Sequence, residues 1–408
     1  MNLPFFIAKR LRDTSGNENR VSPRIIKIAT TAVALGMAMI IIALATGKGL
    51  QTAIRDKTAA FNGHLTLMPF ENNEAKVSLK SITLEEDTKE KILRTSGIHQ
   101  LQGVAYMGGM LKTAEAFEGV VFKGVESDYD WSRLDDFKVV GDYTSLDGDE
   151  VVLSQTLAQR LKIKLGDEVM GYFQNSAKQR IPNTRKFRVA AIYDSGFPDV
   201  DNTLILGAIE QVQSIKRWSP DRVGNYELFL TDFDQQTAIG DDIYSQLPPA
   251  IDVVSLNEQY PSIFQWIALF DYNILIILLV LVIVGVINMA TALLVLIFER
   301  SRMIGVLKTI GATDRFLQMV FLSNGGLILL KGLFWGNLLG LLFFVTQRYG
   351  QWITLDPETY YVSVAPVHLD IFTVVGLNFL VLVVSLLCLW VPLWVVAKIQ
   401  PHQVIRFR

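Results

Sequence analysis

Four long apolar stretches constrain this sequence more than any other feature. They lie at 25–47, 267–298, 316–346 and 371–397. A helix needs roughly 20 apolar residues to cross the hydrocarbon core of a bilayer, so each stretch is long enough. Half of the residues are hydrophobic and 19% are charged, against about 25% charged in soluble proteins. The sequence therefore predicts a membrane protein with four transmembrane helices.

The first stretch has a second interpretation, as a cleavable signal peptide. Basic residues precede it, and it contains the small-residue pattern Ala43, Leu44, Ala45. Its apolar run is longer than the apolar region of a signal peptide, which favours a retained helix. Residues 1–24 include the amphipathic "LPFFIAKRLR" and are expected to form a cytoplasmic segment at the membrane interface.

The distribution of Lys and Arg predicts the orientation. Basic residues are frequent in 1–24, in the segment 299–315 and in the tail 398–408, whereas 347–370 has Arg348 as its one basic residue before His368. Because cytoplasmic flanks carry the excess of Lys and Arg, both termini and the segment 299–315 are expected in the cytoplasm. Residues 48–266 and the loop 347–370 are then expected outside the cytoplasm.

The outer region 48–266 alternates strand and helix patterns. "GVVFKGV", "FRVAAIYDSG" and "NYELFL" are rich in β-branched and aromatic residues, as strands are. In "SQTLAQRLKI", Ser154 can cap a helix that presents Leu157, Ala158 and Leu161 on one face. The expected fold class is an α-helical membrane protein with four transmembrane helices and a large α+β extracytoplasmic domain between the first two. We place a second α+β subdomain at about 127–222, inserted into the first.

The segment "ERSRMIGVLKTIGATDR", 299–315, separates the second and third apolar stretches. As a helix it would place Met303, Ile304, Val306, Leu307 and Ile310 on one apolar face. Gly311 is expected to end this helix and Thr313 to cap the next one. Periodicity alone leaves two readings open: a basic turn at the interface, or a docking surface for a cytoplasmic partner.

The sequence argues against several other chemistries. A net charge of −2 is unlike a nucleic-acid binder. One cysteine, Cys388, and four scattered histidines provide no metal motif, so no metal or catalytic residue is expected. The phosphate-binding pattern G-x-x-x-x-G-K-[ST] is absent from the sequence, so ATP is not expected to be hydrolysed by that route.

The third apolar stretch carries a doubled G-x-x-x-G pattern at Gly332, Gly336 and Gly340. Such a ridge lets another helix backbone approach closely. The sequence does not decide whether this ridge packs against another helix of the same chain or against a second chain. Lys331 beside it is expected to face a polar partner, a polar cavity or the far interface, because a lysine in mid-membrane is costly.

The segment 299–315 resembles the coupling segment of the FtsX-like ABC transporter permease superfamily. The matching positions are Glu299, Arg300, Arg302, Ile304, Leu307, Lys308, Thr309, Gly311 and Ala312. In that superfamily the segment fits a groove on a separate ATPase subunit, so the resemblance implies ATP and Mg²⁺ on a partner chain and a non-catalytic role for this one. Met303 stands where many members have an acidic residue.

The resemblance extends over nearly the whole chain and is greatest for the lipoprotein-releasing permeases of LolC/LolE type. "EVVLSQTLAQRLKIKLGDEV" and "KIQPHQVIRFR" are similar to segments shared by these permeases. The resemblance implies a bacterial inner membrane protein with the region 48–266 in the periplasm. It also implies a dimer with the same chain or a paralogue, and ATP-driven movement of the periplasmic domain. It also implies a loop that engages a periplasmic lipoprotein carrier, with candidate contacts at Gln174, Asn175, Lys178, Arg180 and Pro182; an ordinary hairpin tip is the alternative.

Two other functions are compatible with the same resemblance. One is a split relative of the macrolide exporters that expels peptides or small toxic compounds. The other is a signal transmitter that switches a cell-wall hydrolase without transport.

Overall fold

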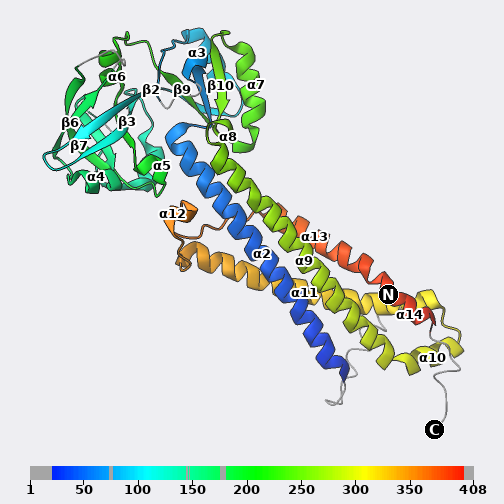
Figure 1. The fold of residues 1–408 in the computed structure, drawn as a ribbon. Coiled ribbons are helices and arrows are strands. Elements are labelled where there is room, and N and C mark those ends of the chain that lie inside the picture. The colour runs from blue at the N-terminus through cyan, green and yellow to red at the C-terminus, as the bar shows by residue number, and fades with distance from the viewer. Residues whose placement is uncertain (1–20, 73–76, 144–145, 147, 175–180, 399–408) are drawn as a thin grey trace. The chain divides into compact units, whose positions relative to one another are not determined.

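The computed structural model describes residues 21–72, 77–143, 146, 148–174 and 181–398, and Figure 1 shows its fold. The chain divides into two compact units. We call residues 1–51, 266–354 and 364–408 the helical unit, and residues 52–265 and 355–363 the sheet unit. The predicted segments 1–24 and 398–408 lie almost wholly outside the described residues.

Four helices of the described chain are long and apolar enough to cross a membrane, as predicted. The first is α2, Val21–Asn62, and the second is α9, Pro261–Glu299. The third is α11, Asp314–Gly350, and the fourth comprises α13, Ile371–Cys388, and α14, Trp390–Lys398. The first three helices extend beyond their predicted ranges, and the fourth is divided into two parts. The residues that lie inside the bilayer remain a prediction.

The fourth helix forms one candidate membrane span, Ile371–Val396, where the sequence predicts one at 371–397. It is interrupted at Leu389, between α13 and α14. Pro392 accounts for the interruption, because proline lacks the backbone N–H that an uninterrupted helix would pair with the carbonyl of Cys388 and its ring clashes with that carbonyl.

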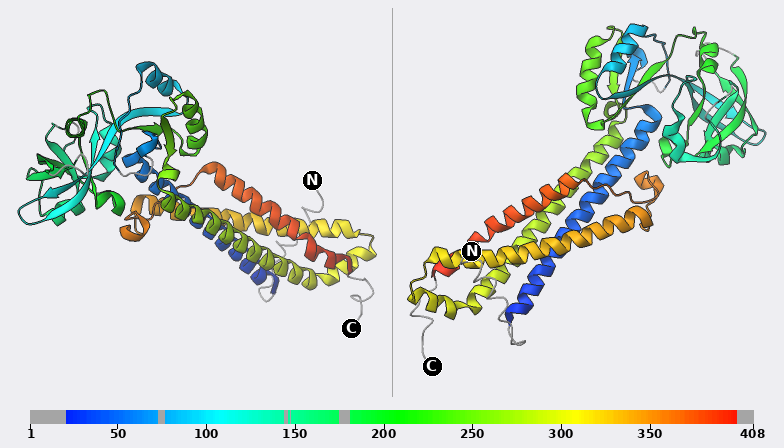
Figure 2. Two further views of the ribbon diagram at one scale, coloured as in Figure 1. Left: turned by 45° about the horizontal axis from the view of Figure 1, so that its top comes forward. Right: turned by 180° about the vertical axis from the view of Figure 1, so that it is seen from behind.

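Helices α2 and α9 run side by side in both Figure 1 and Figure 2. Gln51 on α2 donates from Nε2 to the carbonyl of Ile267 at 3.2 Å and to Oδ1 of Asp271 at 3.0 Å. A Cβ built on Gly47 would lie 2.6 Å from Ile274 Cδ1. These contacts lie within the helical unit and join its first two membrane helices.

The glycine ridge of α11 packs against α2 of the same chain. A Cβ on Gly332, Gly336 or Gly340 would lie 2.6–2.8 Å from the Cβ of Val33, Met37 or Ile41, respectively. At Gly336 it would also lie 2.7 Å from the carbonyl oxygen of Ala34. Of the two packing partners considered for this ridge, the structure shows contact within the chain. The side chain of Lys331 is exposed in the single chain.

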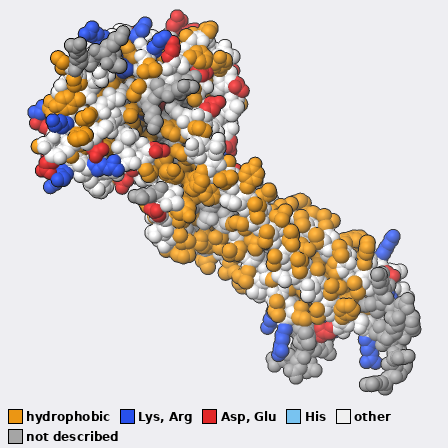
Figure 3. Space-filling view, viewed as in Figure 1, with side chains coloured by type: hydrophobic (Ala, Val, Ile, Leu, Met, Phe, Trp, Pro, Cys, Tyr) orange, Lys and Arg blue, Asp and Glu red, His pale blue; other side chains and the backbone are white. Residues whose placement is uncertain are grey.

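Hydrophobic side chains cover most of the helical surface in Figure 3, whereas charged side chains gather on the sheet unit and at one end of the helical unit. In the most apolar 18-residue segment of α9 only 6% of the residues are buried, so most of them are exposed or partly exposed in the single chain. In water such a surface would be unfavourable, so lipid or another membrane helix is expected to cover it.

The sheet unit contains a ten-stranded sheet within the described residues, in the order β10-β1-β9-β2-β3-β8-β5-β7-β4, with β6 paired to β2 and β7. The strands are β1 Leu65–Pro69, β2 Ile98–Lys112, β3 Phe117–Val125, β4 Lys138–Gly141, β5 Glu150–Ser154, β6 Glu168–Phe173, β7 Asn183–Tyr193, β8 Leu204–Ala208, β9 Asn225–Leu230 and β10 Ile251–Ser255. The helices are α3 Glu86–Arg94, α4 Gln155–Leu161, α5 Pro198–Asp201, α6 Ile209–Lys216, α7 Gln236–Gln246, α8 Leu256–Gln259 and α12 Pro357–Tyr360, with 3-10 turns at Phe70–Asn72, Trp131–Phe137 and Phe233–Gln235. This unit is α+β, as expected.

Local sequence signals explain several of these elements. Ser154 Oγ accepts a hydrogen bond from the backbone N–H of Leu157 at 3.0 Å, which confirms the predicted cap of α4. Leu157, Ala158 and Leu161 are buried, as predicted. The proposed subdomain at 127–222 includes β4 to β8, which continue the sheet through the β3–β8 pair. Its boundary therefore stays a prediction.

His64 lies two residues after the end of α2 and is partly buried beside the rings of Phe229 and Phe233. Its Nδ1 accepts a hydrogen bond from the backbone N–H of Leu230 at 3.1 Å. Burial, followed by the nearby charge of Arg133, lowers the pKa of His64 from 6.5 to about 4. The folded chain therefore favours the neutral ring.

We expect the sheet unit to lose stability as the pH falls from 6.5 to about 4. The pKa is lower in the folded than in the unfolded state, so this contribution is complete above pH 6.5 and disappears through that window. It amounts to about 3 kcal/mol at most. Urea denaturation of the full chain in detergent, followed by tryptophan fluorescence, would measure it. His64→Asn is the control, because its Oδ1 can replace Nδ1 without titrating; an unchanged pH dependence in this variant would contradict the assignment.

Candidate functional site between α9 and α11

Helix α10, Ser301–Thr309, connects α9 to α11 in the helical unit. Gly311 follows it with a φ of +101°, a conformation that favours glycine. The backbone N–H of Ala312 donates to the carbonyl of Leu307 at 2.9 Å, which closes the end of α10. Thr313 Oγ1 then accepts from the N–H of Phe316 at 3.3 Å and caps α11. The predicted stop and cap are both present.

One face of α10 belongs to the core of the helical unit. Ile304 is fully buried, and Met303, Leu307 and Ala312 pack against the same hydrophobic cluster. Substitutions at Ile304 and Leu307 would therefore disturb the core as well as any contact with a partner.

Lys308 fixes α10 to its neighbours. Its Nζ lies 2.8 Å from Oδ1 of Asp314, at the start of α11, and donates to the carbonyl of Val396 on α14 at 3.0 Å. The side chain is largely buried. Lys308 thus has an internal positioning role, whatever its role toward a partner.

The opposite face of α10 is exposed and partly apolar. Val306 is 44% exposed and Ile310 is 78% exposed, with the exposed Arg302 and Thr309 nearby in the helix. Val306 and Ile310 were expected on one apolar face with Ile304, whereas the structure leaves both exposed and buries Ile304. Residues in an α-helix are about 100° apart, so Val306 lies about 200° from Ile304. Ile310 follows the last residue of α10.

The nine predicted coupling positions thus differ in exposure. Ile304 is buried, and the intermediate positions are Arg300, Leu307, Lys308 and Ala312. Those available to a partner without rearrangement are Glu299, Arg302, Thr309 and Gly311. Val306 and Ile310 join this exposed group.

The candidate carrier-contact loop is described only at its ends. Asn175, Lys178 and Arg180 lie outside the described residues. Gln174 and Pro182 are exposed and adjoin β6 and β7, which pair in an antiparallel hairpin with Phe173 opposite Asn183. A role in carrier binding remains a prediction.

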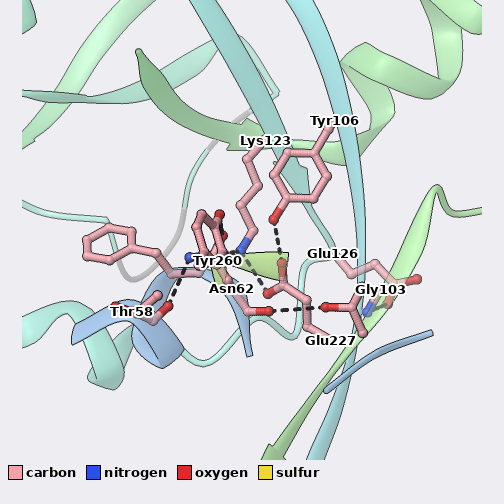
Figure 4. A network of polar contacts seen from close by, with 10 residues as sticks. Thr58, Asn62, Gly103, Tyr106, Lys123, Glu126, Glu227 and Tyr260 are labelled. Atoms are coloured by element: carbon pink, nitrogen blue, oxygen red, sulfur yellow. Dashed lines mark hydrogen bonds and ion pairs between the residues drawn. The ribbon is translucent and has the colours of Figure 1, made fainter. Parts of the chain in front are cut away.

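A buried polar network in the sheet unit was not predicted from the sequence. Lys123 Nζ lies 2.7 Å from Oε2 of Glu227, and both side chains are within 1% of complete burial (Figure 4). Tyr106 donates from its hydroxyl to Oε1 of Glu227 at 2.5 Å. Burial lowers the pKa of Lys123, and the carboxylate of Glu227 opposes this effect. The one available sequence signal is a lysine within the otherwise apolar strand "GVVFKGV".

Four membrane-length helices, together with an α+β unit whose strands all lie between the first two helices in sequence, define a multi-pass membrane protein with one large extramembranous domain. The model of the FtsX-like permease C-terminal family matches residues 275–401. The model of the MacB-like periplasmic core domain matches residues 28–259, more than half of the chain. The chain therefore belongs to the FtsX-like permeases with a MacB-like periplasmic core domain.

Individual relatives match along most of their length. The lipoprotein-releasing system transmembrane protein LolC of Xylella fastidiosa (strain Temecula1) is 24% identical over 392 residues, covering 92% of each chain. The corresponding LolE of Haemophilus influenzae is 24% identical over 436 residues, covering 99% of each chain. The solved periplasmic region of MacB from Actinobacillus actinomycetemcomitans has 14% identity and a TM-score of 0.33, covering 49% of this chain and 91% of that one.

Proposed function

We propose that this chain is the permease subunit of an ABC transporter that releases lipoproteins from the bacterial inner membrane to a periplasmic carrier. The observation that carries the proposal is the similarity to proteins named as lipoprotein-releasing permeases over 92–99% of both chains. It includes the sheet unit as well as the membrane helices, so it covers the domain that would handle the cargo.

In this proposal a separate ATPase subunit binds ATP and Mg²⁺ and docks on the exposed face of α10. Val306 and Ile310 provide apolar contact area, and Arg302 provides a positive charge beside it. Exposed apolar patches rimmed by polar residues are typical of protein interaction sites. The ion pair of Lys308 and the buried Ile304 hold α10 against α11 and α14, so a force on α10 would act on the whole helical unit.

The distribution of Lys and Arg supports cytoplasmic termini and a periplasmic sheet unit. A second copy of the chain or a paralogue would cover the exposed apolar surface of α9. The carrier would contact the loop between β6 and β7. Movement of the membrane helices would then open or close the sheet unit around a lipoprotein taken from the outer leaflet.

Co-purification with the ATPase subunit tests the docking surface. We expect the double variant Val306→Asp/Ile310→Asp to retain less than a tenth of the ATPase recovered with wild type, because two charged carboxylates would have to be desolvated in an apolar contact. Tagged protein purified in detergent and analysed by mass spectrometry gives the ratio of the two chains.

The matched control is Val140→Asp/Ile181→Asp in the sheet unit. Val140 is 42% exposed and Ile181 is 79% exposed, so they match Val306 and Ile310 closely. The control should recover as much ATPase as wild type. If the α10 variant inserts in the membrane and still recovers the ATPase in full, α10 is not the docking site.

A split exporter of peptides or small toxic compounds is the second candidate, favoured by the match to a MacB-like periplasmic core domain. The two functions differ in their periplasmic partner. Recovery of a soluble lipoprotein carrier in the same purification supports lipoprotein release, whereas an outer-membrane channel with its adaptor supports export.

A further inference from the structure

The buried Lys123–Glu227 pair lies where three adjacent strands of the sheet face the end of helix α2. Lys123 is on β3, Glu227 on β9 and Tyr106 on β2. Tyr106 and Lys123 are directly opposite each other in the β2–β3 register. All three side chains converge on one point, as Figure 4 shows.

The ammonium of Lys123 also binds the C-terminal end of α2. Its Nζ donates to the carbonyl of Phe61 at 2.6 Å. The last carbonyls of a helix have no partner within the helix and carry its partial negative charge. Neighbouring carbonyls are satisfied locally, since Asn62 Nδ2 donates to Thr58 at 2.9 Å and the N–H of Gly63 donates to Ala59 at 2.8 Å. Lys123 thus joins the terminus of α2 to Glu227 in the sheet.

The start of α9 meets the same network. The hydroxyl of Tyr260 donates to Oδ1 of Asn62 at 2.8 Å. Tyr260 directly follows α8 and immediately precedes Pro261, the first residue of α9. One hydrogen bond therefore connects the last residue of α2 to the residue before α9.

A second attachment lies one turn earlier on α2. Lys57 donates from Nζ to the carbonyl of Ser195 at 2.6 Å and to that of Tyr361 at 3.1 Å. Ser195 is held by Asp201 through a hydrogen bond of 2.7 Å from its hydroxyl. Tyr361 belongs to the segment between α11 and α13, so this segment is anchored to α2 within the sheet unit.

Stability alone does not explain a buried ion pair at this junction. Desolvation of two charges offsets most of their attraction, and apolar residues of similar volume are often as stabilising. An apolar contact, however, allows a helix end to rotate or slide with little change in energy. A charged hydrogen bond to a particular carbonyl restricts both the rotation and the sliding of the helix end, because its strength depends on distance and angle.

We infer that Lys123 and Glu227 form a clamp that fixes the end of α2, and through Asn62 and Tyr260 the start of α9, to the central sheet. Displacement of the two helices is then passed to the sheet unit instead of being absorbed at the junction. These are positioning residues. The use of the clamp in transport rests on the proposed function, whereas its rigidity does not.

The test compares a charge-free variant with a matched control in the full chain. Lys123→Met/Glu227→Gln removes both charges, leaves no unpaired charge buried and keeps an oxygen for Tyr106. Lys162→Met/Glu115→Gln removes an exposed pair of the same unit, with an N–O distance of 2.8 Å. Spin labels on cysteines at Ser262, in the first turn of α9, and Ala114, between β2 and β3, report the distance between helix and sheet; both positions are exposed. Cys388→Ser removes the native cysteine.

We expect the distance distribution of the charge-free variant to be at least twice as wide as that of wild type, with the control unchanged. In proteoliposomes containing the ATPase subunit, the lipoprotein released per ATP hydrolysed should fall at least fivefold. If the pair had only a structural role, the charge-free variant would give less folded protein. The width of the distance distribution and the lipoprotein released per ATP would then stay as in wild type. An unchanged distance distribution together with unchanged release per ATP would overturn the inference.

The two hypotheses fail in different ways. If wild type hydrolyses ATP and releases no lipoprotein, the proposed function is wrong. The distance distribution alone then tests whether Lys123 and Glu227 fix the helix ends to the sheet. If the charge-free variant does not fold, Tyr260→Phe removes the single bond to Asn62 with little change in shape. It should widen the same distribution, and a distribution identical to wild type would contradict the connection to α9.

Discussion

Replacing Lys123 with Met alone should lower the free energy of unfolding of the sheet unit by about 3–5 kcal/mol. The substitution leaves the carboxylate of Glu227, which is 1% exposed, buried without its cation. Tyr106 still donates to Glu227, but one neutral donor does not replace an ammonium group at 2.7 Å. Chemical denaturation of the full chain in detergent, followed by tryptophan fluorescence, measures the loss.

The double variant Lys123→Met/Glu227→Gln separates the unpaired charge from the other effects of the substitution. It also deprives the carbonyl of Phe61 of its donor, so it should recover most but not all of the stability. Equal stability of the single and double variants would show that the buried charge of Glu227 is not the source of the loss.

Gly336→Ala should destabilise the packing of α11 on α2 by about 1–3 kcal/mol. The added methyl group would lie 2.6 Å from Met37 Cβ and 2.7 Å from the carbonyl oxygen of Ala34. Neither atom belongs to the flexible end of a side chain, so the two helices would have to separate. Because close packing replaces the hydrophobic effect between helices in a bilayer, this separation is costly.

The control is Gly376→Ala on α13, where no heavy atom lies within 4 Å of the added Cβ. Alanine is the better helix former by about 1 kcal/mol, so this variant should be at least as stable as wild type. Thermal denaturation in detergent compares the two, with about 2–4 °C expected for each kcal/mol. If both variants melt together, α11 does not depend on this ridge to pack against α2.

Patterns over many residues were reliable in the sequence. The four membrane helices follow from long apolar runs, and the α+β class of the sheet unit follows from alternating strand and helix patterns. Signals within a few residues also sufficed for the cap at Ser154 and for the end of α10 at Gly311. In each case the determining interaction is with solvent, with lipid or with a residue nearby in the chain.

The exposure of individual residues was less predictable. Val306 and Ile310 have the spacing of an apolar face, yet they are exposed because α10 is short and its neighbours cover the side of Ile304. The glycine ridge was evident in the sequence, but its partner Met37 lies about 300 residues earlier in the chain. Spacing along one helix cannot identify the helix that packs against it.

The sequence by itself determined that this is a membrane protein and how many long apolar helices it has. It also carried the resemblance of the segment 299–315 to a coupling segment. Only the tertiary structure decided which face of α10 is available and that Lys123, Glu227 and Tyr260 meet at the ends of α2 and α9. The physical reason is the range of the interactions. Hydrophobic length and capping depend on neighbours in sequence, whereas a buried ion pair forms between strands separated by 104 residues and becomes evident only when the sheet is assembled.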